Sequence, residues 1–169
     1  MTDPLILTLA LDAGTFAHVD AMRRAHFPPE RNVIPAHLTL FHKLPGDELG
    51  AVTACLSSAA ASAGPIPLAI AGLRFLGRGS AYAVASPALQ ALRARLAAEF
   101  ALWLTPQDRQ RFAPHITIQN KVAPETARRT FETLSTAFEP FEAQGVGLLL
   151  WHYRSGPWEP AGAFPLTGA

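Results

Sequence analysis

Two short segments of the chain repeat the same order of residue types, and each contains a histidine and a threonine. The first runs from His37 to Leu44, and the second runs from His115 to Val122. Both read histidine, aliphatic, threonine, aliphatic, two variable positions, lysine, aliphatic, and these hold the only two lysines of the chain. Imidazoles titrate near neutral pH, so a histidine pair can supply one general base and one general acid. Threonine hydroxyls can donate hydrogen bonds to charge that develops during a reaction. The repeat therefore predicts paired acid–base chemistry.

Strand geometry would bring these groups together. Side chains alternate between the two faces of a β-strand, so His37 and Thr39 share one face. His115 and Thr117 share the corresponding face of the second segment, while the aliphatic residues face the opposite way and need a covering layer. If the two segments belong to pseudo-symmetric halves, their polar faces meet across a cleft. The same alternation predicts that His42 points away from this polar face.

The rest of the chain reads as strands and helices that alternate, separated by prolines and glycines. We expect helices that start at an N-cap at Thr15, after Pro45-Gly46, at Pro87 with Ser86 as its cap, and at Pro124. We expect strands over residues 5–11, 37–44, 66–76, 81–85, 115–122 and 145–153, followed by a tail rich in proline and glycine. Interleaved elements of this kind predict an α+β fold, and 169 residues fit one domain, or two lobes that share a core.

Three segments make the chain resemble a known family: Ile34 to Leu40, Phe75 to Gly79, and Phe112 to Ile118. Their paired histidine–threonine pattern resembles the two-histidine (2H) phosphoesterase superfamily, and within it the bacterial 2′-5′ RNA ligase and 2′,3′-cyclic phosphodiesterase family. The resemblance implies a bilobal, pseudo-two-fold α+β domain over residues 1–169, with antiparallel-rich sheets that line a central cleft and helices outside. It also implies an enzyme that needs no metal or other cofactor and acts on 2′,3′-cyclic phosphates or 2′-5′ phosphodiesters.

The residues of the repeat suit this chemistry, and we expect His37, Thr39, His115 and Thr117 to be catalytic. Opening a cyclic phosphate requires that a base takes a proton from water and an acid protonates the leaving ribose oxygen. The sequence leaves open which histidine has which role, and whether the protein hydrolyses or ligates. The expected partner is a nucleotide or a short RNA. The alternative function is a catalytically silent module of the same fold that binds nucleotides or RNA ends.

Five other residues are candidate substrate contacts. Phe41 and Gln119 lie four residues after the two histidines, where the ring could stack on a base and the amide could bond its edge. Arg78 sits in a glycine-flanked turn from which it could reach a phosphate, and Tyr82 at the start of the next strand could stack on a base. Tyr153, near the end of the last long strand, is the fifth. Ordinary packing, or an exposed turn for Arg78, explains these residues equally well.

Composition excludes several other classes of protein. A formal charge of +1, from 14 basic and 13 acidic residues, argues against a nonspecific binder of long nucleic acid, which needs a strongly basic face. The single cysteine, Cys55, excludes internal disulfides and the usual cysteine-based zinc sites. A metal centre built from the histidines would need three or more protein ligands, and the spacing of the histidines does not indicate such a centre. With no long apolar run and no basic leader, we expect a cytoplasmic protein.

Overall fold

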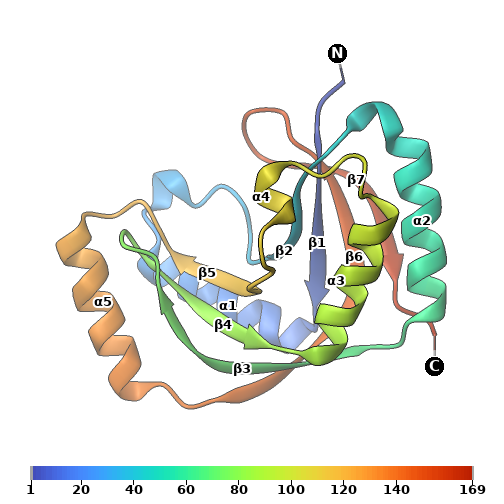
Figure 1. The fold of residues 1–169 in the computed structure, drawn as a ribbon. Coiled ribbons are helices and arrows are strands. Elements are labelled where there is room, and N and C mark those ends of the chain that lie inside the picture. Colours follow the sequence, from blue (N-terminus) through green and yellow to red (C-terminus); the bar gives the residue numbers. More distant parts are fainter. Residues whose placement is uncertain (1, 169) are drawn as a thin grey trace.

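Seven β-strands and five α-helices alternate along residues 2–168, which are the residues that this computed structural model describes (Figure 1). The strands are β1 (Leu5–Leu11), β2 (Leu38–Leu44), β3 (Ile66–Phe75), β4 (Ser80–Ala85), β5 (His115–Gln119), β6 (Phe141–His152) and β7 (Glu159–Pro165). The helices are α1 (Ala13–His26), α2 (Leu49–Ser62), α3 (Pro87–Glu99), α4 (Pro106–Arg109) and α5 (Pro124–Ala137). Two short 3₁₀ turns, Pro29–Arg31 and Gly46–Glu48, precede β2 and α2.

The strands form one antiparallel sheet that consists of two halves. Its order is β2-β1-β6-β3-β4-β5, and β7 also pairs with β6. The long strand β6 serves both halves, because residues 141–145 pair with β3 and residues 145–152 pair with β1. One half is therefore β2-β1-β6-β7 and the other is β5-β4-β3-β6. The predicted α+β fold with two pseudo-symmetric halves is confirmed.

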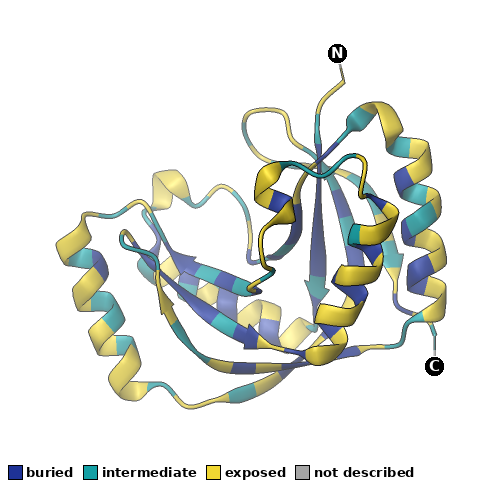
Figure 2. Ribbon diagram, in the orientation of Figure 1, coloured by how far each residue is buried: buried dark blue, intermediate teal, exposed yellow. Residues whose placement is uncertain are grey.

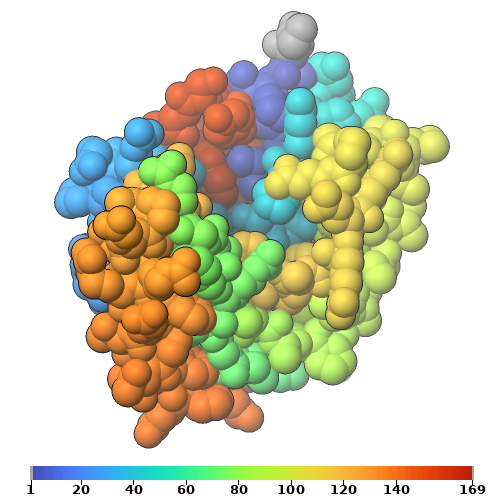
Figure 3. Space-filling model, turned by 60° about the vertical axis from the view of Figure 1, so that its left-hand side comes forward, coloured from blue at the N-terminus to red at the C-terminus, as the bar shows by residue number. Residues whose placement is uncertain are grey.

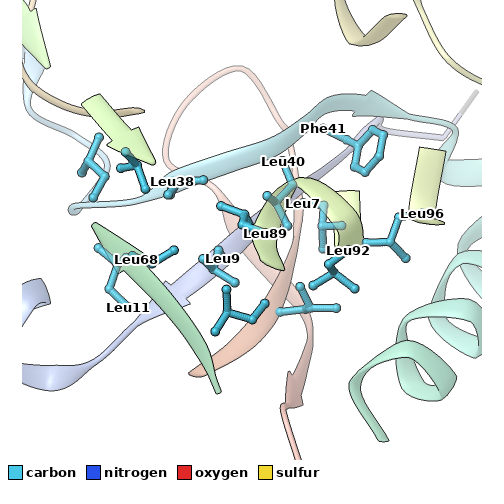
Figure 4. Packing of buried hydrophobic residues seen from close by; sticks show 14 of the residues in the cluster. Leu7, Leu9, Leu11, Leu38, Leu40, Phe41, Leu68, Leu89, Leu92 and Leu96 are labelled. Atoms are coloured by element: carbon cyan, nitrogen blue, oxygen red, sulfur yellow. The ribbon is translucent and has the colours of Figure 1, made fainter. Parts of the chain in front are cut away.

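The four longer helices, α1, α2, α3 and α5, pack on the aliphatic side of the two halves, and the short helix α4 lies next to β2. In Figure 1, α2 lies beside β6 and β7 and next to α3, which also contacts β3, whereas α1 lies beside β5 and α5 lies beside β3 and β4. Helix α1 follows β1 in sequence but packs against β5 of the other half. Figure 2 shows that the helices bury one stripe each and that β1 is buried along most of its length. Leucines of β1, β2 and α3 interdigitate in this core, among them Leu7, Leu40 and Leu92 (Figure 4).

Each histidine-bearing strand contains a β-bulge directly after its threonine. In β2 the register changes between the pairs Thr8–Thr39 and Leu7–Phe41, and this leaves one extra residue on β2. In β5 the register changes in the same way between Ala81–Thr117 and Ser80–Gln119. A bulge of this kind reverses the alternation of side chains beyond it. The two residues that follow each threonine are consequently both buried.

Several details differ from the sequence-based expectations. Helix α1 is capped by the carboxylate of Asp12, which accepts a hydrogen bond from the backbone N–H of Thr15, so the prediction of Thr15 as the N-cap is wrong. The second repeat strand ends at Gln119 because the chain turns at Lys121, which has a positive φ of 64°. The tail rich in proline and glycine, for which no strand was predicted, contains β7. The expected cap at Ser86 is confirmed, since its hydroxyl accepts from the N–H of Leu89.

Candidate active site

The two histidine–threonine pairs meet at one cavity. His37 and Thr39 from β2 and its lead-in line a hollow of about 200 Å³ together with His115 and Thr117 from β5. The other lining residues are Ile6, His42 and Trp158. Figure 3 views a face on which the surface is hollowed between the green β3–β4 hairpin and the yellow α4 segment, with the teal β2 at its floor. The side-chain alternation of the sequence is therefore valid up to each threonine.

Both imidazole rings are held in the same way by the backbone two residues before them. Nδ1 of His37 lies 2.9 Å from the carbonyl oxygen of Pro35, and Nδ1 of His115 lies 3.0 Å from that of Ala113. A carbonyl oxygen can only accept, so Nδ1 carries the proton and donates it in each ring. In the neutral ring, this leaves Nε2 with a lone pair and no backbone partner. Each ring is thus oriented, with Nε2 available for proton transfer.

The surroundings of both rings favour their neutral forms. Burial lowers the pKa of His37 to about 4, and the positive charges of Arg23, His115 and His42 act in the same direction, against the hydrogen bond to Pro35. Burial also lowers the pKa of His115, helped by the guanidinium of Arg74 and opposed by the hydrogen bond to Ala113. In the free protein at neutral pH, both Nε2 atoms are therefore mainly unprotonated. A bound anion would raise both pKa values, because it stabilises the charged rings.

The two threonine hydroxyls complete a ring of hydrogen-bonding groups around the cavity. Thr39 and Thr117 are both half-buried, and neither hydroxyl has a hydrogen-bond partner among residues 2–168. Each hydroxyl can rotate and donate to an oxygen that enters the cavity. The cavity therefore offers two imidazoles and two hydroxyls to one small polar group.

Buried arginines fix the two repeat strands from outside the cavity. Arg23 of α1 donates to the carbonyl oxygen of Thr117 at 2.9 Å, and Arg93 of α3 donates to that of Leu40 at 2.8 Å. Both arginines are nearly inaccessible to solvent. A carboxylate oxygen of Asp20 accepts from the backbone N–H of Ala36, the residue before His37, at 3.2 Å. These contacts restrict how far the two repeat strands can shift.

His42 lines the cavity, so the prediction that it points away from the polar face is wrong. The bulge after Thr39 turns His42 onto the face that Thr39 occupies. Its Nδ1 lies 3.1 Å from Oδ1 of Asp108, which is 1% exposed. The same carboxylate accepts from the backbone N–H groups of His42 and Lys43. Burial alone would raise the pKa of Asp108, but these hydrogen bonds hold it below its ordinary value.

Trp158 and Arg74 also belong to the surroundings of the site, and the sequence analysis did not single them out. The Trp158 ring packs against the His37 ring with 4.8 Å between centroids. Arg74 of β3 places Nη1 3.3 Å from Nδ1 of His115. Trp158 lies in the segment between β6 and β7, so no strand pattern could relate it to His37. The nearest residue that the sequence pointed to was Tyr153.

Phe41 and Gln119 are core residues rather than substrate contacts. Both lie directly after the extra bulge residue, which turns them away from the cavity and into the protein. Phe41 is 0% exposed, and the guanidinium of Arg93 stacks 3.9 Å from the centre of its ring. Gln119 is 2% exposed, and its amide donates to the carbonyl of His26 and to the hydroxyl of Thr130. The sequence could not show the bulges, so it placed these two residues on the wrong face.

The other three candidate contacts also lie away from the cavity. Arg78 is in the exposed β3–β4 turn, where its guanidinium donates to the carbonyl of Val122. Tyr82 pairs with Ile116 on the aliphatic side of the sheet, is 5% exposed, and its hydroxyl lies 3.2 Å from Nε2 of His18. Tyr153 is 44% exposed just beyond β6 and does not line the cavity. None of the three is a contact of the cavity as it stands.

Two further observations concern other kinds of site. Within residues 2–168, no three histidine, cysteine, aspartate or glutamate side chains are arranged to hold a metal ion. None of the helices in this same part of the chain has the length and apolar character needed to cross a membrane.

Comparisons with known proteins identify the family and the fold of the chain. The family model described as the 2′-5′ RNA ligase superfamily matches residues 11–157. Among solved structures, TT0787 of Thermus thermophilus is similar with a TM-score of 0.70 and 19% identity, over 98% of both chains. E. coli LigT complexed with 3′-AMP is similar with a TM-score of 0.64 and 18% identity, over 99% of both chains. No curated protein sequence matches the chain.

The structural likeness extends over nearly the whole chain and shows a common fold at low sequence identity. The family match covers both histidine–threonine strands, which the structure brings to one cavity. The chain therefore belongs to the 2′-5′ RNA ligase superfamily and has the two-histidine phosphoesterase fold.

Proposed function

We propose that this protein is a metal-independent phosphoesterase that opens a 2′,3′-cyclic phosphate, or cleaves a 2′-5′ phosphodiester, at the end of a short RNA or on a small nucleotide. The observation that carries the proposal is the convergence of His37, Thr39, His115 and Thr117 on one cavity. Nucleotide complexes of E. coli LigT, which include 3′-AMP, ATP and NADP+, support a nucleotide as the ligand class.

The proton transfers follow from the two oriented rings. One neutral Nε2 takes a proton from water as the water oxygen attacks phosphorus. The phosphorus–oxygen bond to one ribose oxygen breaks, and the second imidazole, protonated at Nε2, gives its proton to that leaving oxygen. The pKa of about 4 favours His37 as the neutral base. His115 then gains its proton when the anionic phosphate binds, because negative charge nearby raises the pKa of an imidazole. The same sequence of transfers, with a 5′-hydroxyl in place of water, joins that hydroxyl to the cyclic phosphate, and its reverse, in which the neighbouring ribose hydroxyl attacks phosphorus and the 5′-oxygen leaves, cleaves a 2′-5′ linkage.

The threonines would stabilise the charge that builds on the non-bridging oxygens. Two hydroxyl donors in a partly enclosed cavity are already placed before the reaction, so little reorganisation is needed in the transition state. His42 is not assigned a proton transfer in this scheme.

The test is a panel of 2′,3′-cyclic mononucleotides, an RNA with a cyclic end, and 2′-5′-linked dinucleotides, assayed in a metal chelator. His37→Ala and His115→Ala should each lower kcat/KM by at least about 10²-fold, because each removes one proton-transfer group. The matched control is His152→Ala, which removes a histidine from the end of β6, outside the residues that line the cavity. It should retain activity. Full activity in either cavity variant would reject the assignment.

The second candidate function, a silent nucleotide-binding module, keeps the same ligand and lacks turnover. The intact pair of free Nε2 atoms favours an enzyme over this module. Calorimetric binding of 2′-AMP without conversion of any substrate in the panel would favour the module instead. Formation of 2′-5′ linked product from a cyclic end and a free 5′-hydroxyl would add ligation to the activity.

A further inference from the structure

A second hollow opens beside the catalytic cavity and carries an excess of positive charge. This basic groove, of about 290 Å³, shares three lining residues with the catalytic cavity: Thr39, His42 and His115. Because the two hollows share these side chains, one ligand can occupy both. The remaining lining residues come from β2, β3, α3 and the α4–β5 segment: Leu40, Arg74, Arg93, Gln107, Asp108, Gln110, Arg111, Phe112 and Ala113.

The one carboxylate among the residues that line the basic groove is already fully engaged. Both oxygens of Asp108 accept from the backbone of His42, one also accepts from Lys43, and Nδ1 of His42 completes the set. Arg93 donates from Nε to the carbonyl oxygen of Leu40 and from Nη2 to that of Asp108, and its guanidinium stacks on aromatic rings. Among residues 2–168, the Asp108 carboxylate forms no ion pair with Arg74 or Arg111.

Arg74 and Arg111 therefore present charge that the protein does not neutralise. Both are exposed, and among residues 2–168 neither lies within 4 Å of a carboxylate. Arg74 contacts Nδ1 of His115 and the carbonyl of Ala113, and its guanidinium has donors left over. Nε2 of His42 is a further polar atom here, since its Nδ1 is held by Asp108. A chain with a net charge of only +1 thus concentrates cations beside one end of its catalytic cavity.

The part of the cavity that the basic groove does not share is aromatic, because His37 and Trp158 line the cavity but not the groove. Trp158 packs on His37 there, and Trp151 lies 6.1 Å from Trp158 between ring centroids. One end of the cavity is thus aromatic and the other is cationic. A ligand that fills both hollows should carry an anion on the side of His115 and Arg111.

We propose that the basic groove binds a second phosphate of the substrate, so that the preferred substrate is a nucleotide that carries another phosphate in addition to the one that reacts. This inference rests on the proposed function, because it places the reacting phosphate between His37 and His115. The second phosphate can be a 5′-phosphate on the same nucleoside or the internucleotide phosphate of a dinucleotide. Arginine guanidinium groups suit either, since they donate two parallel hydrogen bonds to phosphate oxygens.

The experiment compares matched ligands with and without the second phosphate at low salt. Isothermal titration uses 2′-AMP against adenosine 2′,5′-bisphosphate. Kinetics use adenosine 2′,3′-cyclic phosphate against its 5′-phosphorylated form and against a diadenosine that ends in a cyclic phosphate. We expect roughly tenfold tighter binding, or tenfold higher kcat/KM, for at least one ligand with the second phosphate, as charge-assisted hydrogen bonds give differences of this order. If only one of these two kinetic substrates has the higher kcat/KM, that substrate identifies whether the groove binds a 5′-phosphate or an internucleotide phosphate.

Variants connect that preference to the groove. In the double variant Arg74→Gln/Arg111→Gln, ligands with and without the second phosphate should have nearly equal Kd and kcat/KM values, so that their ratio is close to one. The ratio cancels any effect that Arg74 has on His115 and on the reaction itself. Arg129→Gln removes the same charge from the exposed face of α5, outside the groove, and should keep the wild-type ratio.

The possible outcomes separate this inference from the proposed function. If the protein turns over cyclic phosphates but Kd and kcat/KM are equal with and without the second phosphate, the role of the basic groove as a phosphate site is rejected. The proposed function then remains in place. A binding preference that depends on the two arginines, without turnover, supports the groove and rejects the catalysis. Absence of binding by every nucleotide overturns both. If the double variant still prefers ligands with the second phosphate, the groove is also rejected as the site that binds it.

Discussion

Removing the Asp108 carboxylate should destabilise the whole fold, because this one side chain holds two backbone donors of the bulged strand. Asp108 is 1% exposed and accepts from the N–H groups of His42 and Lys43 at 2.9–3.0 Å. In Asp108→Ala both N–H groups lose this partner. Each N–H that loses this charged acceptor costs about 1–3 kcal/mol, so the loss of both should lower the free energy of unfolding by roughly 2–6 kcal/mol. That is a large share of the roughly 5–15 kcal/mol that stabilises a typical domain.

Urea unfolding at pH 7, followed by circular dichroism, measures this cost. Asp108→Asn keeps one acceptor oxygen and should lie between the wild type and the alanine variant. Glu132→Ala, which removes an exposed carboxylate from the middle of α5, should change the stability by no more than about 0.5 kcal/mol. A loss below about 1 kcal/mol in Asp108→Ala would refute the reasoning, since it would mean that water or another group satisfies both donors.

The pH dependence of the same variant gives an independent check. The folded-state pKa of Asp108 is held below its ordinary value, so its ionised form stabilises the fold above the unfolded pKa, which is about 3.9. This contribution is lost as the pH falls through the lowered folded-state pKa. The difference in stability between the wild type and Asp108→Ala should therefore shrink below pH 4. A difference that stays constant down to pH 2 would show that ionisation of Asp108 is irrelevant.

Three further outcomes follow from the site and the core. In histidine NMR titrations of the free protein, His37 should titrate near pH 4, and Trp158→Ala should move this pKa toward 6.5 by exposing the ring; an unchanged pKa would assign the burial to other groups. Phe41→Ala should cost about 3–5 kcal/mol of stability, measured by urea unfolding, because the ring is fully buried; a cost below about 1 kcal/mol would contradict its place in the core. Thr39→Val and Thr117→Val should each lower kcat roughly 10–100-fold while the unfolding midpoint stays close to that of the wild type, and equal kcat values would remove the hydroxyls from the reaction.

Alternation along a strand predicted the centre of the site because it needs only local geometry. His37 and Thr39 are two residues apart before the bulge, and so are His115 and Thr117, so each pair must share a face. The family resemblance added that the two strands face one another. The first strand, Leu5–Leu11, was predicted over its full extent because all of its residues except Thr8 are apolar and it lies between Pro4 and Asp12.

Alternation failed wherever the structure depends on a partner strand. The bulges in β2 and β5 exist only in relation to β1 and β4, and nothing within either segment marks the extra residue. Phe41 and Gln119 were consequently placed on the polar face and His42 on the apolar face, each the reverse of what the structure has. Trp158 enters the site from an irregular segment, and such segments have no periodicity to extrapolate.

Because β6 is common to both halves, the chain cannot be cut between its repeats into two self-sufficient pieces. A fragment that ends after the first repeat would keep β1 paired with β2 but would lose the neighbour of the other edge of β1. That edge would expose unpaired backbone groups along a strand of leucines, which is a template for aggregation. The last third of the chain thus completes the first, and a nascent chain reaches its stable pairing only after residue 152 has emerged from the ribosome.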